Sequence, residues 1–117
     1  MSIVQLNATK TTSNGWDVTK FEDGRMIATL VKNYGTLTCS GSWYGWWYCG
    51  FGTDQALPDG FTTVPIIYGT YIGGNGLFEI RAANVTKTKV GFFYLIEARQ
   101  NASFSDDVHL LAVGRWK

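Results

Sequence analysis

Residues 16–31 read WDVTKFEDGRMIATLV, and this stretch decides the fold class. Two runs rich in β-branched and aromatic residues, 16–21 and 25–31, flank the polar residues EDG. Asp23-Gly24 is a strong hairpin signal because glycine accepts a positive φ without steric penalty. The stretch therefore predicts two antiparallel strands joined by a tight turn.

Similar strand-like runs recur over the rest of the chain, at residues 36–40, 61–72, 77–83, 90–99 and 108–117. Turn-forming segments separate several of them, among them the loop 52–60 with its PDG and the glycine-rich segment 73–76. No segment repeats apolar residues with the 3.6-residue period of a helix over three turns. We therefore predict an all-β protein of about seven or eight antiparallel strands, folded as a single β-sandwich domain.

The last two predicted strands carry apolar residues on both faces. The opposing sets are Phe92, Tyr94 and Ile96 against Phe93 and Leu95, and Val108, Leu110 and Ala112 against Leu111 and Val113. Charged residues make up only 16% of the chain, below the share of about 25% in an average soluble domain. An apolar face that does not point into the core must be shielded from water, and homo-oligomerisation is the simplest way to shield it.

Several partner classes are disfavoured by charge and composition. A net charge of +1 without a cluster of Lys or Arg argues against binding to nucleic acid. No apolar run approaches the roughly 20 residues of a membrane span, and the first residues lack the pattern of an export signal, so we expect no membrane insertion. Cys39 and Cys49 are then expected to be reduced and buried. The spacing of Cys and of the single His109 predicts no metal site.

The most unusual segment is WYGWWYCGF at residues 43–51. Read as one regular strand, it would place Trp43, Trp47 and Cys49 on one face, and three aromatic side chains, Tyr44, Trp46 and Tyr48, on the other. One interpretation buries one row in the core and packs the other against a neighbouring subunit. Another uses Trp43, Tyr44, Trp46, Trp47 and Tyr48 to bind a ligand, because their rings suit stacking on a sugar. A third is independent packing within a loop.

Other polar residues give weaker signals. Asp106, Asp107 and His109 have the composition of a solvated turn that enters a strand. Glu79 with Arg81, and Glu97 with Arg99, are expected to form exposed or interfacial ion pairs, with a cross-strand ladder between the two strands. No pattern indicates a nucleophile with a base or a pair of catalytic carboxylates, so we expect no enzyme and no cofactor.

The order of several motifs resembles the C-terminal domain of bacteriophage tail fibre and minor tail structural proteins. These motifs are WDVTKFEDGRMIATLV, LPDGFTTVPIIYGTY, NVTKTKVGFFYL and the terminal HLLAVGRWK. The resemblance covers roughly residues 16–117. It departs from the family at WYGWWYCGF, where family members carry a plain polar loop.

The resemblance implies a trimeric β-sandwich knob at the distal tip of a fibre, where it contacts the bacterial surface. Residues 16–117 would form this tip domain, and residues 1–15 an N-terminal segment or linker from the fibre shaft. The expected function is non-enzymatic binding of a bacterial cell-surface glycan by a homotrimer in the virion tail, made in the host cytoplasm. The alternatives are a free monomeric carbohydrate-binding module or lectin, and a structural trimerisation cap without a ligand.

Overall fold

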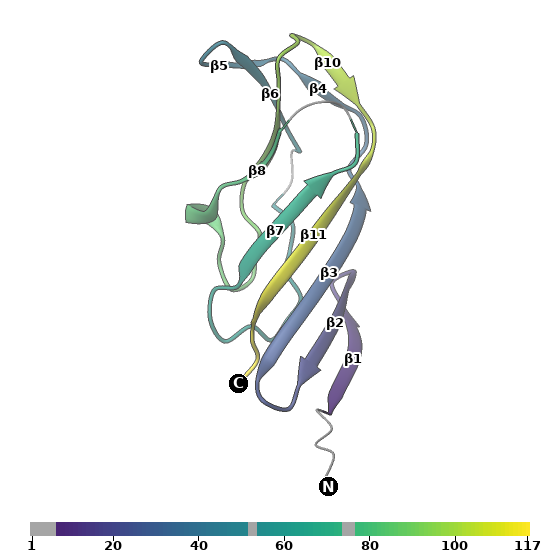
Figure 1. The fold of residues 1–117 in the computed structure, drawn as a ribbon, viewed down its shortest axis with the longest axis vertical. Helices are drawn as coiled ribbons and strands as arrows, with labels where there is room; N and C mark the ends of the chain where they lie inside the picture. The colour runs from purple at the N-terminus through teal and green to yellow at the C-terminus, as the bar shows by residue number, and fades with distance from the viewer. Residues whose placement is uncertain (1–6, 52–53, 74–76) are drawn as a thin grey trace, which may run out of the picture.

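The computed structural model describes residues 7–51, 54–73 and 77–117, and in these residues the chain is all-β, with three antiparallel sheets (Figure 1). The strands are β1 (Ala8–Ser13), β2 (Trp16–Phe21), β3 (Arg25–Asn33), β4 (Leu37–Cys39), β5 (Gly41–Trp43), β6 (Trp46–Gly50), β7 (Ile66–Tyr71), β8 (Leu77–Ile80), β9 (Phe93–Glu97), β10 (Ala102–Phe104) and β11 (Asp107–Arg115). A short 3-10 helix spans Ala82–Asn84. Within the described ranges, no helix has the length and apolar character needed to cross a membrane.

The largest sheet has the strand order β1-β2-β3-β11-β7 and runs along the elongated molecule (Figure 1). The hairpin predicted at residues 16–31 is confirmed, because β2 pairs with β3 in antiparallel register from Asp17 opposite Thr29 to Lys20 opposite Met26. Strands β3 and β11 then pair over nine residues each. The first and last strands therefore belong to one sheet.

A second sheet has the order β5-β6-β9-β8, and β4 pairs with β10 in a separate two-stranded ladder. Figure 1 shows β4, β5, β6 and β10 gathered at the end of the molecule opposite the C-terminus. The aromatic segment is thus carried at one tip.

The core is built by the alternation of side chains along the strands. Its largest fully buried side chain is Trp16, whose Nε1–H donates a hydrogen bond to the Ala56 carbonyl at 2.7 Å. Buried residues from both larger sheets surround it in one cluster, including Met26, Ala28, Leu30, Phe93, Leu95, Val108, Leu110 and Ala112. Of the two faces predicted for residues 108–113, the face with Leu110 is therefore the core face. Leu111 and Val113 lie on the outer face, only half-buried.

The described residues form eleven strands, more than the predicted seven or eight, and some strand boundaries differ from the prediction. Residues 8–13, within the segment read as a linker, form β1 and pair with β2. Within the run 61–72, the strand β7 begins only at Ile66, after the buried Pro65. It is an edge strand of its sheet, which is one of the positions where proline is tolerated. Of the predicted loop 52–60 and turn 73–76, residues 52–53 and 74–76 lie outside the described residues.

The expectation of reduced cysteines is wrong in this structure, because Cys39 and Cys49 form a disulfide. Both are buried, as expected. Strand β4 contacts β6, so residues that are ten apart in sequence face each other across two neighbouring strands. The disulfide fixes the base of the β5–β6 hairpin to β4.

Reduction of this disulfide is expected to lower the free energy of unfolding by about 2–3 kcal/mol, because the unfolded chain regains the freedom of a loop of about ten residues. Urea unfolding with and without a reductant measures the difference. A Cys39→Ala/Cys49→Ala variant is the control, since the reductant should not change its unfolding midpoint. Identical midpoints for the oxidised and reduced wild-type chain would contradict the prediction.

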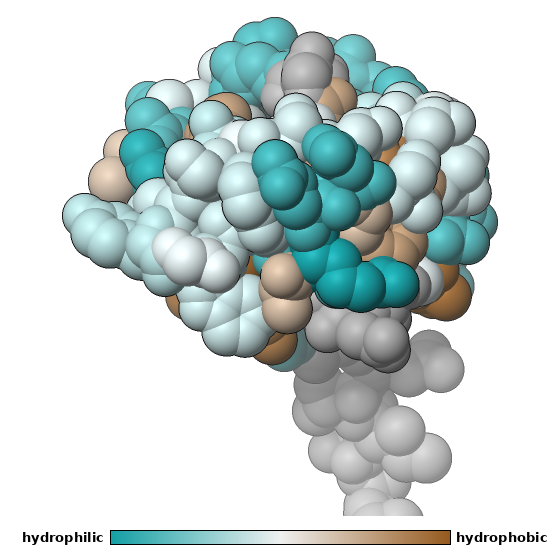
Figure 2. All heavy atoms as spheres, turned by 90° about the horizontal axis from the view of Figure 1, so that it is seen from above, coloured by the Kyte–Doolittle hydropathy of each residue, from teal (hydrophilic) through white to brown (hydrophobic). Residues whose placement is uncertain are grey.

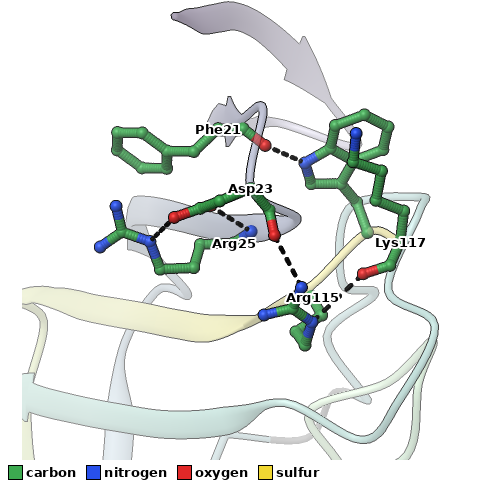
Figure 3. A network of polar contacts seen from close by, with 6 residues as sticks. Phe21, Asp23, Arg25, Arg115 and Lys117 are labelled. Atoms are coloured by element: carbon green, nitrogen blue, oxygen red, sulfur yellow. Dashed lines mark hydrogen bonds and ion pairs between the residues drawn. The ribbon is translucent and has the colours of Figure 1, made fainter. Parts of the chain in front are cut away.

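The C-terminus is fixed to the turn between β2 and β3 by a polar network (Figure 3). The Arg115 guanidinium donates to the Asp23 carbonyl at 2.7 Å, and the Trp116 indole donates to the Phe21 carbonyl at 2.7 Å. Asp23 also accepts hydrogen bonds from the backbone and side chain of Arg25, and the backbone bond is the main cause that lowers its pKa below the ordinary 3.8. Trp116 is partly buried and packs against the core.

Candidate functional site

The segment 41–50 forms a hairpin, so the faces that one regular strand would give residues 43–51 do not apply. Strands β5 and β6 pair with Trp43 opposite Trp46, and Tyr44 and Gly45 form the turn between them. Both turn residues have positive φ, 49° and 83°, as two-residue type I′ hairpin turns require. Gly45 adopts this conformation readily, whereas tyrosine seldom does.

This turn changes which aromatic side chains share a face. Residues directly opposite each other in an antiparallel pair point to the same side, so Trp43, Trp46 and Tyr48 share the outer face. Their exposed fractions are 45%, 46% and 39%. Trp47 points to the opposite side with the buried Cys49 and packs against the core. Tyr44, at the tip of the turn, is 89% exposed.

Strands β9 and β8 extend this outer face away from the hairpin. Strand β6 pairs with β9, with Tyr48 opposite Ile96 and Gly50 opposite Tyr94. Phe92, two residues before Tyr94, continues the same face and is exposed. Of the two apolar faces predicted for residues 92–96, the one with Phe92 and Tyr94 therefore lies beside the aromatic hairpin, and its third member, Ile96, is buried.

Arg81 joins this face at the end of β8. Its backbone N–H donates to the Phe92 carbonyl at 2.9 Å, and its own carbonyl accepts a hydrogen bond from the Asn84 N–H at 2.9 Å. Gly91, with a φ of 82°, packs so closely on the Asn84 backbone that a Cβ would overlap it. These contacts fix the main chain around Arg81 and Phe92.

Together these strands form a pocket of about 280 Å³ lined by Trp43, Tyr48, Arg81, Phe92 and Tyr94. The ring centroids of Phe92 and Tyr94 are 5.4 Å apart, and those of Tyr48 and Tyr94 are 6.5 Å apart. The Arg81 guanidinium carbon lies 5.7 Å from the centroid of Phe92. Aromatic rings thus form most of the wall, with one cation at its edge.

A glycine on β5 sets the position of one of these rings. The Tyr48 ring lies over Gly41, its cross-strand partner, in the space that a Cβ at residue 41 would occupy. Any larger residue there would displace the ring. Gly41 therefore leaves the space in which the Tyr48 ring lies against β5 and lines the pocket.

Figure 2 shows the end of the molecule that carries the hairpin. Residues of intermediate hydropathy, drawn pale, cover much of this end, and strongly hydrophobic ones appear only in places. Trp and Tyr belong to the intermediate class, with an apolar ring and a polar N–H or O–H group. Such a surface can contact both the C–H groups and the hydroxyls of a ligand.

The structure does not bring the other sequence candidates together into a site. His109 is exposed on the outer face of β11, between Val31 and Thr70 of the neighbouring strands. Asp106 is also exposed, and its backbone N–H bonds to the Tyr71 hydroxyl. Among the described residues, no three His, Cys, Asp or Glu side chains are grouped to hold a metal ion.

The predicted ion pairs are correct in only one case. Arg99 pairs with Glu97 at 2.9 Å, and the Glu97 side chain is buried. In the part of the chain that the structure describes, Glu79 forms no ion pair with Arg81. The expected Glu/Arg ladder is also wrong, because the register places Glu79 opposite Tyr94.

Sequence reasoning missed Arg81, Phe92 and Tyr94 as pocket residues. The alternation in β9 did show that Phe92 and Tyr94 share a face that needs cover. No local signal shows that β9 lies between β6 and β8, because these pairings join distant parts of the chain.

Comparison with known proteins gives no assignment for this fold and pocket. No protein-family model, no curated protein and no solved structure matches the chain.

Proposed function

We propose that the chain is a non-enzymatic binding domain that attaches to a glycan on the bacterial cell surface. In this proposal it forms a β-sandwich knob at the distal end of a phage tail fibre or a related tail protein. The observation that carries the proposal is the pocket of exposed aromatic rings on the outer face of β6 and β9. The sequence resemblance to phage tail proteins supplies the biological setting.

The chemistry of the pocket suits a saccharide. Flat rings such as those of Trp43, Phe92 and Tyr94 can stack on the apolar C–H face of a pyranose, while indole and phenol groups bond to its hydroxyls. A pocket of about 280 Å³ is close to the lower end of the range for small-ligand sites, roughly 300 Å³, and so suits one or two sugar units. Weak binding at one site is sufficient if several copies of the domain bind together.

Self-association into a homotrimer is the second part of the proposal. The outer face of β3, β11 and β7 presents adjoining apolar residues, since Val113 lies between Ile27 and Ile66 and Leu111 lies next to Tyr68. We call this the β3–β11–β7 face. Val31, Ile66 and Tyr68 on it are each 59% exposed. A second copy that covered these residues would remove a large apolar area from water.

Binding of the protein to an array of bacterial cell-surface polysaccharides and lipopolysaccharides tests the glycan proposal. Replacement of Trp43 by Ala is expected to weaken binding by about tenfold, because it removes one wall of the pocket. Thr11→Ala, on the exposed strand β1, is the matched control and should bind like the wild-type chain.

The outcome also separates the two alternative functions. Binding by a chain that stays monomeric would favour a free carbohydrate-binding module. A well-folded trimer that binds no polysaccharide on the array would favour a structural cap and overturn the proposed glycan function. Unchanged binding of Trp43→Ala would show that the pocket is not the binding site.

A further inference from the structure

The polar side-chain groups that line the pocket are mainly hydrogen-bond donors. Its side chains offer the Trp43 indole N–H, the hydroxyls of Tyr48 and Tyr94, and the Arg81 guanidinium. Indole and guanidinium groups only donate hydrogen bonds. Among the residues that the structure describes, no carboxylate or amide side chain lines the pocket to accept a bond from a sugar hydroxyl. A ligand group that only accepts hydrogen bonds is the best complement to this set.

Arg81 differs from the other three arginines in its bonding. Arg25 and Arg99 pair with carboxylates at 2.8 and 2.9 Å, and the Arg115 guanidinium bonds to main-chain carbonyls. Within the described residues, the Arg81 guanidinium forms no hydrogen bond or ion pair. Its contact there is the face of the Phe92 ring, which holds it at the edge of the pocket. The planar guanidinium thus keeps its hydrogen-bond donors available.

From these observations we infer that the pocket takes an acidic saccharide, in which a carboxylate or phosphate group on the sugar binds the Arg81 guanidinium. This inference rests on the proposed function. The guanidinium fork matches the two oxygens of a carboxylate or phosphate, and such charge-assisted bonds are stronger than neutral ones. The rings of Phe92 and Tyr94 would meanwhile contact the sugar itself. Arg81 would select the charge, and the aromatic wall would supply the contact area.

A panel of acidic bacterial polysaccharides tests the inference, with each polymer presented in its native form and in a form without its charge. Uronic acid polymers are compared with their carboxyl-reduced forms, and phosphate-containing polymers with their dephosphorylated forms. Neutral polysaccharides complete the panel. We expect the wild-type chain to bind at least one native acidic polymer about tenfold or more tightly than its uncharged form. If the uronic acid polymers show this difference in affinity, the acidic group is a carboxylate. If the phosphate-containing polymers show it, the group is a phosphate.

Three variants connect this preference to Arg81. Arg81→Gln should lose the preference for the charged form, and Arg81→Lys should keep only part of it, because lysine retains the charge without the fork. Lys10→Gln removes the same charge from the exposed strand β1 and should keep the full preference. Circular dichroism and thermal melting confirm that each variant is folded.

The possible results distinguish failure of the acidic-saccharide inference from failure of the proposed glycan-binding function. Equal binding to charged and uncharged forms, or binding to neutral polymers alone, would overturn the inference and leave glycan binding in place. An acidic preference that persists in Arg81→Gln would also overturn it. Failure to bind any polymer would remove the proposed function itself.

Discussion

The wild-type chain is expected to be a trimer at micromolar concentrations, and a chain that carries Ile66→Lys and Tyr68→Lys is expected to be monomeric at the same concentrations. Both residues are 59% exposed and lie on the edge strand β7, next to Val113 and Leu111 of β11. Two ammonium groups buried in an apolar interface without partners would cost several kcal/mol. The same side chains are tolerated on a free edge strand, so the fold should persist.

Light scattering or sedimentation gives the mass that checks this prediction. Thr9→Lys/Thr11→Lys is the matched control, because it adds the same charge to exposed positions on β1, at the opposite edge of the sheet. That variant should remain trimeric. A wild-type chain that is itself monomeric would contradict the assignment of the β3–β11–β7 face to self-association.

Replacement of Trp16 by Ala is expected to lower the free energy of unfolding by about 3–5 kcal/mol, a large part of the stability of a small domain. Trp16 has an exposed fraction of 0% and is the largest side chain in the core. The change opens a cavity and also removes the hydrogen bond from its indole N–H to the Ala56 carbonyl. The Ala56 carbonyl would then no longer accept a hydrogen bond from a side chain of β2.

Chemical denaturation measures this loss, with Trp46→Ala as the control of the same residue type. Trp46 is 46% exposed on the outer face of the hairpin, so its removal should cost about 1 kcal/mol or less. Similar losses from the two variants would mean that the division of the tryptophans between core and surface is wrong.

The parts of the fold that depend on local pattern could be predicted from the sequence. The hairpin at residues 16–31 follows from Asp23-Gly24 between two strand-like runs, and the structure has it in that place. The apolar second faces of the last two strands were also visible as alternating residues. Short-range alternation and turn chemistry are encoded within a few residues, so the sequence is enough to read them.

The remaining features depend on positions that no local pattern specifies. A tyrosine at positive φ is uncommon, so the sequence did not locate the turn at Tyr44-Gly45, which decides which aromatic side chains share a face. The disulfide requires β4 beside β6, and the pocket requires β9 between β6 and β8. Arg81 became a pocket residue only through the register that places it beside Phe92.

The indole N–H signals of the five tryptophans in an NMR titration test the saccharide site most directly. The titrant is the polysaccharide fragment that binds best on the array. If the pocket binds the saccharide, the Trp43 signal shifts with saturation, while those of Trp16 and Trp116, whose N–H groups bond to main-chain carbonyls, stay in place. A saturating titration in which the Trp43 signal does not move would contradict binding in the pocket.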